Sequence, residues 1–349
     1  MKEERNVPLA PLTSLGAGGA AAHLVTVEPA DALPETLNAL PKAPDWVLGY
    51  GTNTLISDAG LPGTTLLLRN DDIAVDRATI TAGAGAWWDD VVRLAIEKGL
   101  WGIELMSGIP GSVGAGVFIN INAYGQAIVD TLAWVEAWDP SSGELRRFAK
   151  ADLPWGYKQS AFQQEPYARM IVTRAAFALS DRRRAALTYQ SALDVAQELR
   201  CDPDDLASRR EIILETRHRA ASIYVPGHAD PKTAGSFFRN PVVTPEQAEA
   251  IMVADETGKT RAQIMAMNTV HGGDAMRVSA AHVMLAAGFS RGQAWGKVKL
   301  NDQHLLKIEN AGGATAQEIY NVAKNIQRTV REKLGIELKP EVRILGEFT

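Results

Sequence analysis

The sequence predicts an α+β protein of two or three domains. Its 349 residues exceed the usual size of one domain. Short strand patterns alternate with helix patterns but lack the regular spacing of β-α-β units, which argues against a doubly wound sheet. Strands are expected at residues 22–27, 46–49, 64–68, 78–83, 132–138 and 172–179. Helices are expected at residues 34–40, 87–98, 191–200, 203–219, 244–253 and 315–334.

Composition excludes several classes of protein. A formal net charge of −5 argues against a general nucleic-acid binder, because neutralising phosphates needs a basic surface. The single cysteine, Cys201, excludes an internal disulfide and a cysteine-cluster metal site, and no metal is expected. The mixed charges of residues 1–5 do not resemble a signal peptide, and no segment has the length of a membrane span. We therefore expect a soluble, cytoplasmic protein.

A glycine-rich stretch at residues 107–125 is the most informative part of the chain. Five glycines within residues 108–125 indicate backbone that bends sharply and allows close approach of a large ligand. Such backbone can direct several N–H groups at an anion. The apolar run 113–121 is too short and broken for an ordinary buried helix. The stretch is also compatible with a tight loop between buried elements that holds no ligand.

A second candidate loop follows the strand predicted at residues 46–49. Residues 49–57 combine two glycines with small polar side chains, which can form a phosphate cradle. The pattern is not a Rossmann fingerprint, since its third glycine is absent and a strand follows instead of a helix. Further along, residues 226–231 break the chain with prolines and glycine, and they indicate a domain boundary.

Four motifs together resemble the UDP-N-acetylenolpyruvoylglucosamine reductase family. They are residues 49–57, residues 108–125, the Ala-Gly-Ser-Phe-Phe run at 234–238 and the Pro-Glu-Val-Arg run at 340–343. They occur in family order across nearly the whole chain. The resemblance implies an FAD-binding fold of the vanillyl-alcohol-oxidase type with two subdomains, residues 1–70 and 71–225. A third α+β domain, residues 226–341, would bind substrate, and residues 342–349 would return to the first subdomain.

The family reduces the enolpyruvyl group of a UDP-sugar to give UDP-N-acetylmuramate for peptidoglycan synthesis. The resemblance therefore implies non-covalent FAD, NADPH as reductant and a small UDP-sugar substrate. The residues that it assigns to FAD lie in the two glycine-rich stretches: Tyr50, Gly51, Thr52, Asn53, Thr54, Gly108, Ile109, Pro110, Gly111, Ser112, Gly114, Gly116, Ile119 and Asn120.

Three positions correspond to the family's catalytic residues. Ser236 would donate a proton to the carbanion formed by hydride transfer, a role that depends on position more than on acidity. Glu341 would help to hold the developing negative charge, which requires a protonated carboxyl or a shared hydrogen-bond network. Lys158 stands where the family has arginine, so it keeps the charge but loses the bidentate fork.

The resemblance also implies substrate contacts, with two further departures from the family pattern. Ala221 replaces a lysine that meets the substrate diphosphate, and Gln190 replaces a glycine next to Tyr189. The implied substrate-binding residues are Tyr157, Tyr189, Phe238 and Asn240.

Two other functions stay open at the level of sequence. An FAD-dependent oxidase of a sugar or hydroxy acid could use the same scaffold, and the departures at Lys158 and Ala221 keep this alternative open. A flavin-binding protein without catalysis is opposed by the presence of Ser236 and Glu341. No membrane or nucleic-acid partner is expected, and a monomer is favoured.

Overall fold

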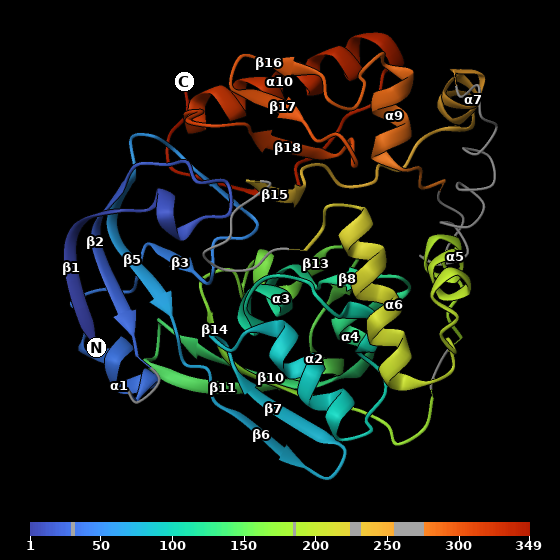
Figure 1. Cartoon of the computed structure of the whole chain (residues 1–349). Helices are drawn as coiled ribbons and strands as arrows, with labels where there is room; N and C mark the ends of the chain where they lie inside the picture. Colours follow the sequence, from blue (N-terminus) through green and yellow to red (C-terminus); the bar gives the residue numbers. More distant parts are fainter. Residues whose placement is uncertain (29–31, 184–185, 224–231, 255–275) are drawn as a thin grey trace. The chain divides into compact units, whose positions relative to one another are not determined.

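The computed structural model describes residues 1–28, 32–183, 186–223, 232–254 and 276–349 (Figure 1). The chain divides into two compact units. Unit 1 comprises Met1–Val7, Ala21–Gly51 and Leu61–Gly227, and unit 2 comprises Pro8–Ala20, Thr52–Gly60 and His228–Thr349. The boundary predicted at residues 226–231 lies wholly outside the described residues.

Unit 1 begins with a small sheet. Its strand order is β1-β2-β5-β3, and β5 pairs in parallel with both β2 and β3. These strands and the adjacent helix are β1 (Lys2–Pro8), β2 (Ala20–Val27), β3 (Trp46–Leu48), β5 (Leu61–Leu68) and α1 (Leu33–Ala39). Leu66 and Val25 are fully buried, as expected for strands rich in branched apolar residues. The strands predicted at 22–27, 46–49 and 64–68 and the helix at 34–40 are confirmed.

Unit 1 also contains a five-stranded antiparallel sheet, in the order β11-β10-β14-β7-β6. Its strands are β6 (Ile73–Asp76), β7 (Thr79–Gly83), β10 (Leu132–Asp139), β11 (Glu144–Ala149) and β14 (Ile171–Ala178). Helix α2 (Trp88–Glu97) lies beside this sheet (Figure 1). Its Trp88 ring meets the Phe177 ring of β14 edge-on at 5.6 Å. The strands predicted at 78–83, 132–138 and 172–179 and the helix at 87–98 are confirmed.

The prediction that the apolar run 113–121 is not a helix is wrong. Val113–Ile119 form helix α3, which begins at Ser112, whose hydroxyl accepts a hydrogen bond from the Ala115 N–H. Gly114 allows the helix to lie directly on the sheet, because a Cβ there would be 2.8 Å from the Cβ of Ala84. Capping and close packing therefore stabilise a helix that is too short to show a periodic pattern.

Two helices complete unit 1. They are α5 (Gln190–Leu199) and α6 (Leu206–Arg219), and they bury a small cluster that includes Val195, Ile212 and Leu105. Both confirm the predicted helices, although α6 begins three residues later than expected because Asp205 caps it. The remaining short elements are β8 (Asn122–Ala123), β9 (Gln126–Ala127), α4 (Ile128–Thr131), β12 (Trp155–Gly156), β13 (Gln159–Ser160) and the 3-10 helices Glu104–Met106, Lys150–Asp152 and Ala161–Gln163.

Unit 2 is built on an antiparallel sheet with the order β15-β18-β17-β16. Its strands are β15 (Thr233–Ser236), β16 (Ala294–Trp295), β17 (Val298–Leu300) and β18 (Lys307–Asn310), and its helices are α7 (Pro245–Ala254), α9 (Ala280–Ala286), α10 (Ala316–Leu334) and the 3-10 helix Ala10–Leu12. Helix α10 begins with a capping box between Thr315 and Glu318 and ends at Gly335, as predicted. Strand β19 (Arg343–Leu345) pairs in parallel with β4 (Thr54–Ile56).

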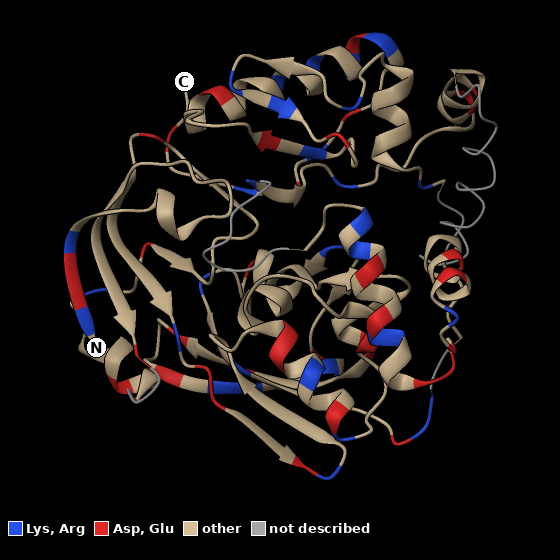
Figure 2. Ribbon diagram, in the orientation of Figure 1, with Lys and Arg blue, Asp and Glu red and all other residues tan. Residues whose placement is uncertain are grey.

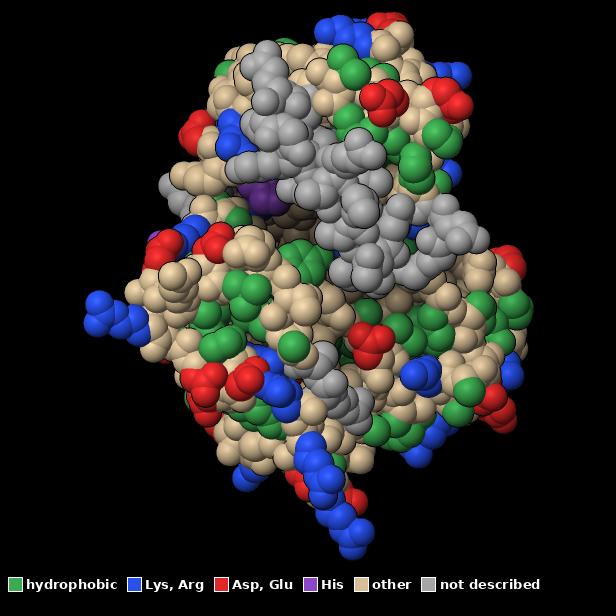
Figure 3. Space-filling model, turned by 90° about the vertical axis from the view of Figure 1, so that its right-hand side faces the viewer, with side chains coloured by type: hydrophobic (Ala, Val, Ile, Leu, Met, Phe, Trp, Pro, Cys, Tyr) green, Lys and Arg blue, Asp and Glu red, His purple; other side chains and the backbone are tan. Residues whose placement is uncertain are grey.

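Figure 2 shows charged residues of both signs interspersed along the helices. Figure 3 shows the same mixture on the face that it draws. No helix among the described residues is both long and apolar enough to cross a membrane. The same residues contain no group of three or more His, Cys, Asp or Glu side chains that could hold a metal ion.

Candidate functional site

The two glycine-rich stretches meet inside unit 1. Gly49 directly follows strand β3 and lies against Ser112, the residue that caps helix α3. A Cβ placed on Gly49 would collide with the Ser112 hydroxyl. The approach is possible only because residue 49 has no side chain. Gly49 and Ser112, which are 63 residues apart in the sequence, thus lie on one surface.

Some backbone groups of these loops are already used by the protein. The N–H groups of Gly114 and Gly116 donate to Ala84 and Ser112, and the Gly108 N–H donates to Asp89. In contrast, within the described residues no acceptor meets the N–H groups of Gly51, Gly111 or Ser112, although these residues are buried. Buried donors that the protein leaves unpaired need a partner from outside the chain. An anionic ligand with several oxygens, such as the diphosphate of FAD, fits these donors.

A cationic and aromatic cluster lies beside the first loop, and sequence reasoning missed two of its members. The Arg69 guanidinium donates to the Gly49 carbonyl at 2.9 Å and lies 4.3 Å above the Tyr50 ring. The Trp87 ring meets Tyr50 edge-on at 4.7 Å. Burial lowers the pKa of Arg69 and raises that of Tyr50. The only sequence signal for a cation close to the loop is the position of Arg69, directly after the strand predicted at 64–68.

The predicted loop 50–54 is divided between the two units. Tyr50 and Gly51 belong to unit 1, whereas Thr52, Asn53 and Thr54 belong to unit 2. Asn53 joins the C-terminal segment: its amide donates to the Glu341 carbonyl at 3.2 Å, and its own carbonyl accepts from the Arg343 N–H at 3.0 Å.

The far end of α3 holds the hairpin that carries Tyr157 and Lys158. Asn120 ends the helix in the left-handed conformation, with φ of 48°, and its amide donates to the Gly156 carbonyl at 2.9 Å. The Ser160 hydroxyl donates to the Phe118 carbonyl at 2.6 Å. Tyr157 and Lys158 form the two-residue turn between β12 and β13, and Lys158 has a positive φ of 54°. Both of these side chains are half-buried.

The remaining predicted residues of unit 1 lie as follows. Tyr189 directly precedes α5, and its ring meets the Tyr124 ring edge-on at 5.4 Å. Burial raises the pKa of both phenols. Tyr124 was not among the predicted site residues. Ile109, Pro110 and Ile119 are half-buried.

In unit 2 the serine and glutamate motifs adjoin. Ser236 ends strand β15, and the carbonyl of the next residue, Phe237, accepts from the Glu341 N–H at 2.8 Å. Both Ser236 and Glu341 are half-buried. Phe238 is only 1% exposed and packs on Phe237. The Asn240 side chain accepts from the Ala280 N–H at 3.0 Å, at the start of α9.

The catalytic candidates are therefore divided between the units. Ser236 and Glu341 belong to unit 2, and Lys158 belongs to unit 1.

Fold and site together define an FAD-binding flavoprotein. Residues 21–149 match the FAD binding domain family, and residues 227–345 match the UDP-N-acetylenolpyruvoylglucosamine reductase C-terminal domain family. The chain is 35% identical to UDP-N-acetylenolpyruvoylglucosamine reductase from Mycobacterium marinum, over 98% of this chain and 94% of that protein. It is 33% identical to the reductase of the same name from Streptomyces coelicolor, over 99% and 91%.

A solved structure has the same fold. The UDP-N-acetylenolpyruvylglucosamine reductase from Thermus caldophilus superposes with a TM-score of 0.68 at 24% identity, over 99% of this chain and all of that one. The chain belongs to the UDP-N-acetylenolpyruvoylglucosamine reductase family and is an FAD-dependent oxidoreductase. The predictions of an α+β fold and of FAD as cofactor are confirmed.

Proposed function

We propose that this enzyme reduces the enolpyruvyl group of UDP-N-acetylglucosamine-enolpyruvate to give UDP-N-acetylmuramate, with NADPH as the reductant. The full-length similarity to the named reductases supports this substrate. The observation that carries the proposal is the Glu341–Phe237 backbone hydrogen bond, which brings the serine and glutamate motifs together. The reaction belongs to a step of peptidoglycan precursor synthesis.

In this proposal FAD lies on the glycine-rich loops, and the two FAD subdomains are residues 1–70 and 71–225. The buried N–H groups of Gly51, Gly111 and Ser112 receive its anionic part, and Arg69 supplies positive charge nearby. FAD held there would supply hydride transfer from NADPH to the vinyl carbon of the substrate.

Ser236 then donates its hydroxyl proton to the carbon next to the one that received hydride. A serine hydroxyl is a weak acid, but a carbanion is a strong base, so a donor held in place suffices. The bulge between Thr233 and Ser236 in the β15–β18 pair supports this role, since bulges redirect side chains next to active sites.

Glu341 and Lys158 hold the negative charge that develops on the substrate carboxylate. Glu341 is half-buried, and the family resemblance assigns it this role. The positive φ of Lys158 fixes the turn from which its ammonium group extends. Lysine acts there as a point charge instead of the fork that arginine would offer.

The substrate-binding domain is residues 226–341 in this proposal, and other side chains complete the substrate site. Tyr157, Tyr189 and Asn240 contact the sugar nucleotide, and Phe238 supports the site from the core. We further propose that the enzyme acts as a monomer in the cytoplasm.

Isotopic labelling tests this function. Purified enzyme is given the enolpyruvyl UDP-sugar with NADPH carrying deuterium at the transferred position, or with ordinary NADPH in heavy water. In heavy water the product should carry deuterium at the carbon that accepts the proton, as read by mass spectrometry and NMR. Deuterium from NADPH should reach the adjacent carbon to the extent that the N–H of the reduced flavin does not exchange with solvent first. The absence of product, with oxygen-dependent peroxide formation from sugars or hydroxy acids instead, would favour the oxidase.

A further inference from the structure

One face of helix α6 is directed at a single residue of the second glycine-rich loop, Gly108. Arg210, Leu214 and Arg217 are spaced at i, i+4 and i+7 and therefore lie on the same side of the helix. A Cβ on Gly108 would be 2.8 Å from Leu214 Cδ2, so the helix lies directly against this glycine. Gly108 has a φ of 70°, which also favours glycine.

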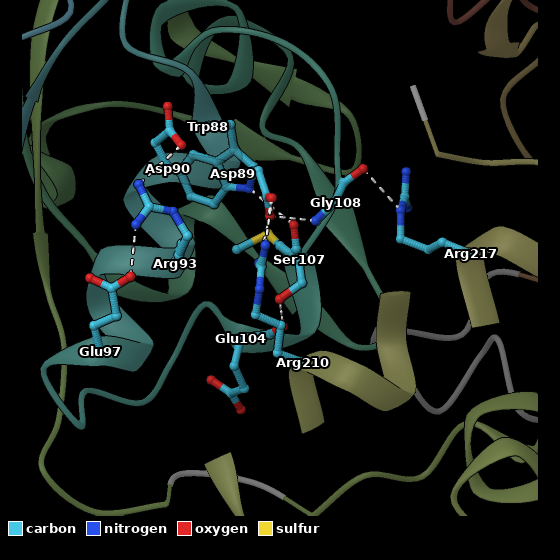
Figure 4. Close-up of polar contacts among 11 residues, drawn as sticks. Trp88, Asp89, Asp90, Arg93, Glu97, Glu104, Ser107, Gly108, Arg210 and Arg217 are labelled. Carbon is cyan, nitrogen blue, oxygen red and sulfur yellow. Dashed lines mark hydrogen bonds and ion pairs between the residues drawn. The ribbon is translucent and has the colours of Figure 1, made fainter. Parts of the chain in front are cut away.

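The two arginines fix the two polar groups of Gly108 in different ways. Arg217 Nε donates to the Gly108 carbonyl at 3.1 Å (Figure 4). Its Nη2 donates to the Ser222 carbonyl at 2.7 Å. Arg210 acts through Asp89, a residue in the first turn of α2. Asp89 Oδ1 accepts from the Gly108 N–H at 2.6 Å.

Asp89 and Arg210 form a bidentate pair. Arg210 Nη1 and Nη2 donate to Asp89 Oδ1 and Oδ2, both at 2.7 Å, and the two side chains are only 19% and 21% exposed. Burial alone would raise the pKa of Asp89, but the hydrogen bonds from Arg210 and the Gly108 N–H outweigh it and hold that pKa below its ordinary value. The carboxylate is therefore charged at neutral pH and holds both donors strongly.

We propose that Asp89, Arg210 and Arg217 are positioning residues for FAD, which hold the Gly108 peptide groups so that the unpaired N–H groups of Gly111 and Ser112 face the cofactor. This inference rests on the proposal that the second glycine-rich loop contacts FAD. Gly108 lies three residues before Gly111, so a fixed Gly108 leaves few backbone torsions free in between. A loop held in its binding conformation loses less entropy when the ligand binds.

A matched control lies on helix α2, the helix that carries Asp89. Arg93 forms ion pairs with Asp90 at 3.4 Å and Glu97 at 2.7 Å, and it is 53% exposed (Figure 4). These contacts lie within the helix and do not reach the glycine-rich loop. Arg93→Gln therefore removes an arginine ion pair from α2 without removing a Gly108 contact.

The test measures FAD affinity on full-length protein that has been freed of flavin and titrated with FAD. Arg210→Gln should raise the Kd about tenfold or more, the scale of a lost charge-assisted contact. Arg210→Lys, which keeps the charge but loses the fork, should recover part of that loss. Arg93→Gln should leave the Kd within about twofold of wild type, as is usual for exposed pairs.

Melting curves of the flavin-free variants separate positioning from folding. If Arg210→Gln lowers the melting temperature while the folded protein keeps the wild-type Kd for FAD, the pair is only structural and the inference is wrong. Equal Kd values for Arg210→Gln, Arg93→Gln and wild type would also overturn it, without touching the proposed reaction. Wild-type protein that binds no FAD would instead contradict the FAD loop itself.

Discussion

Ser236 is a single side chain whose proposed role separates the two half-reactions. If its hydroxyl only protonates the carbanion, Ser236→Ala should leave flavin reduction by NADPH near the wild-type rate. Reoxidation by the enolpyruvyl substrate should slow by ~10²-fold or more, because a positioned general acid is lost. Both rates are measured from flavin absorbance, and Ser236→Cys should recover part of the second.

A turn-capping serine would give a different result. Its removal should cost about 1 kcal/mol of stability and disturb both half-reactions alike. Equal slowing together with a lower melting temperature would remove Ser236 from the catalytic residues.

His304 gives unit 2 a pH-dependent stability. Burial, followed by the charges of Lys307 and Arg291, lowers the pKa of His304 to about 4, and its Nδ1 accepts from the Leu306 N–H. The folded state therefore holds a neutral ring. The unfolded state binds a proton below about pH 6.5, so stability falls as the pH decreases from there to about 4.

Across that range, protonation of His304 in the unfolded state should lower the free energy of unfolding by up to about 3 kcal/mol. His304→Asn, which cannot take up the proton in either state, should show a flatter decrease between pH 7 and 5. Urea denaturation at several pH values measures the free energy of unfolding of both proteins. Parallel curves for variant and wild type would contradict the shifted pKa.

At the scale of elements, Gly49 decides how closely the first loop can approach helix α3. Gly49→Ala would force its new methyl group against the Ser112 hydroxyl and separate the two loops. We expect weaker FAD binding and a loss of stability of about 1–3 kcal/mol, as for other overpacked sites. Gly156→Ala is the control, because a Cβ there meets mainly the flexible end of Gln159.

Titration with FAD and a melting curve check the Gly49 prediction. An unchanged Kd for FAD in Gly49→Ala would show that the contact between the loops does not shape the cofactor site.

Elements with a clear periodicity could be predicted from the sequence, and others could not. Helix α10 has both its cap signals and a long amphipathic pattern, so its limits follow closely from the sequence. Helix α3 has only seven residues and two glycines, and its stability depends on the Ser112 cap and on packing against Ala84. The arginines of α6 lie more than 100 residues from Gly108, and only the fold reveals their target.

For the whole molecule, sequence motifs identify the candidate residues. They do not show to which of the two units each residue belongs. The motifs in family order indicate the candidate flavin loops and the candidate catalytic serine and glutamate. That residues 52–60 fold with unit 2 follows from the parallel pairing of β4 with β19, which joins segments almost 300 residues apart. Such long-range pairing has no local sequence signal.

The cofactor should be held without a covalent bond. Neither residues 49–57 nor residues 107–125 contain a histidine or cysteine that could tether flavin. We expect a yellow protein that releases intact FAD into the supernatant on acid precipitation. Flavin that stays with the precipitate would indicate a tether elsewhere and would favour the oxidase.

Anaerobic stopped-flow spectroscopy of the wild-type enzyme tests the central claim most directly. NADPH should bleach the flavin absorbance, and the enolpyruvyl UDP-sugar, added without oxygen, should restore it at a rate that depends on its concentration. UDP-N-acetylglucosamine, which lacks the vinyl group, should leave the flavin reduced. Flavin that the enolpyruvyl substrate cannot reoxidise, but that oxygen reoxidises rapidly, would contradict the account.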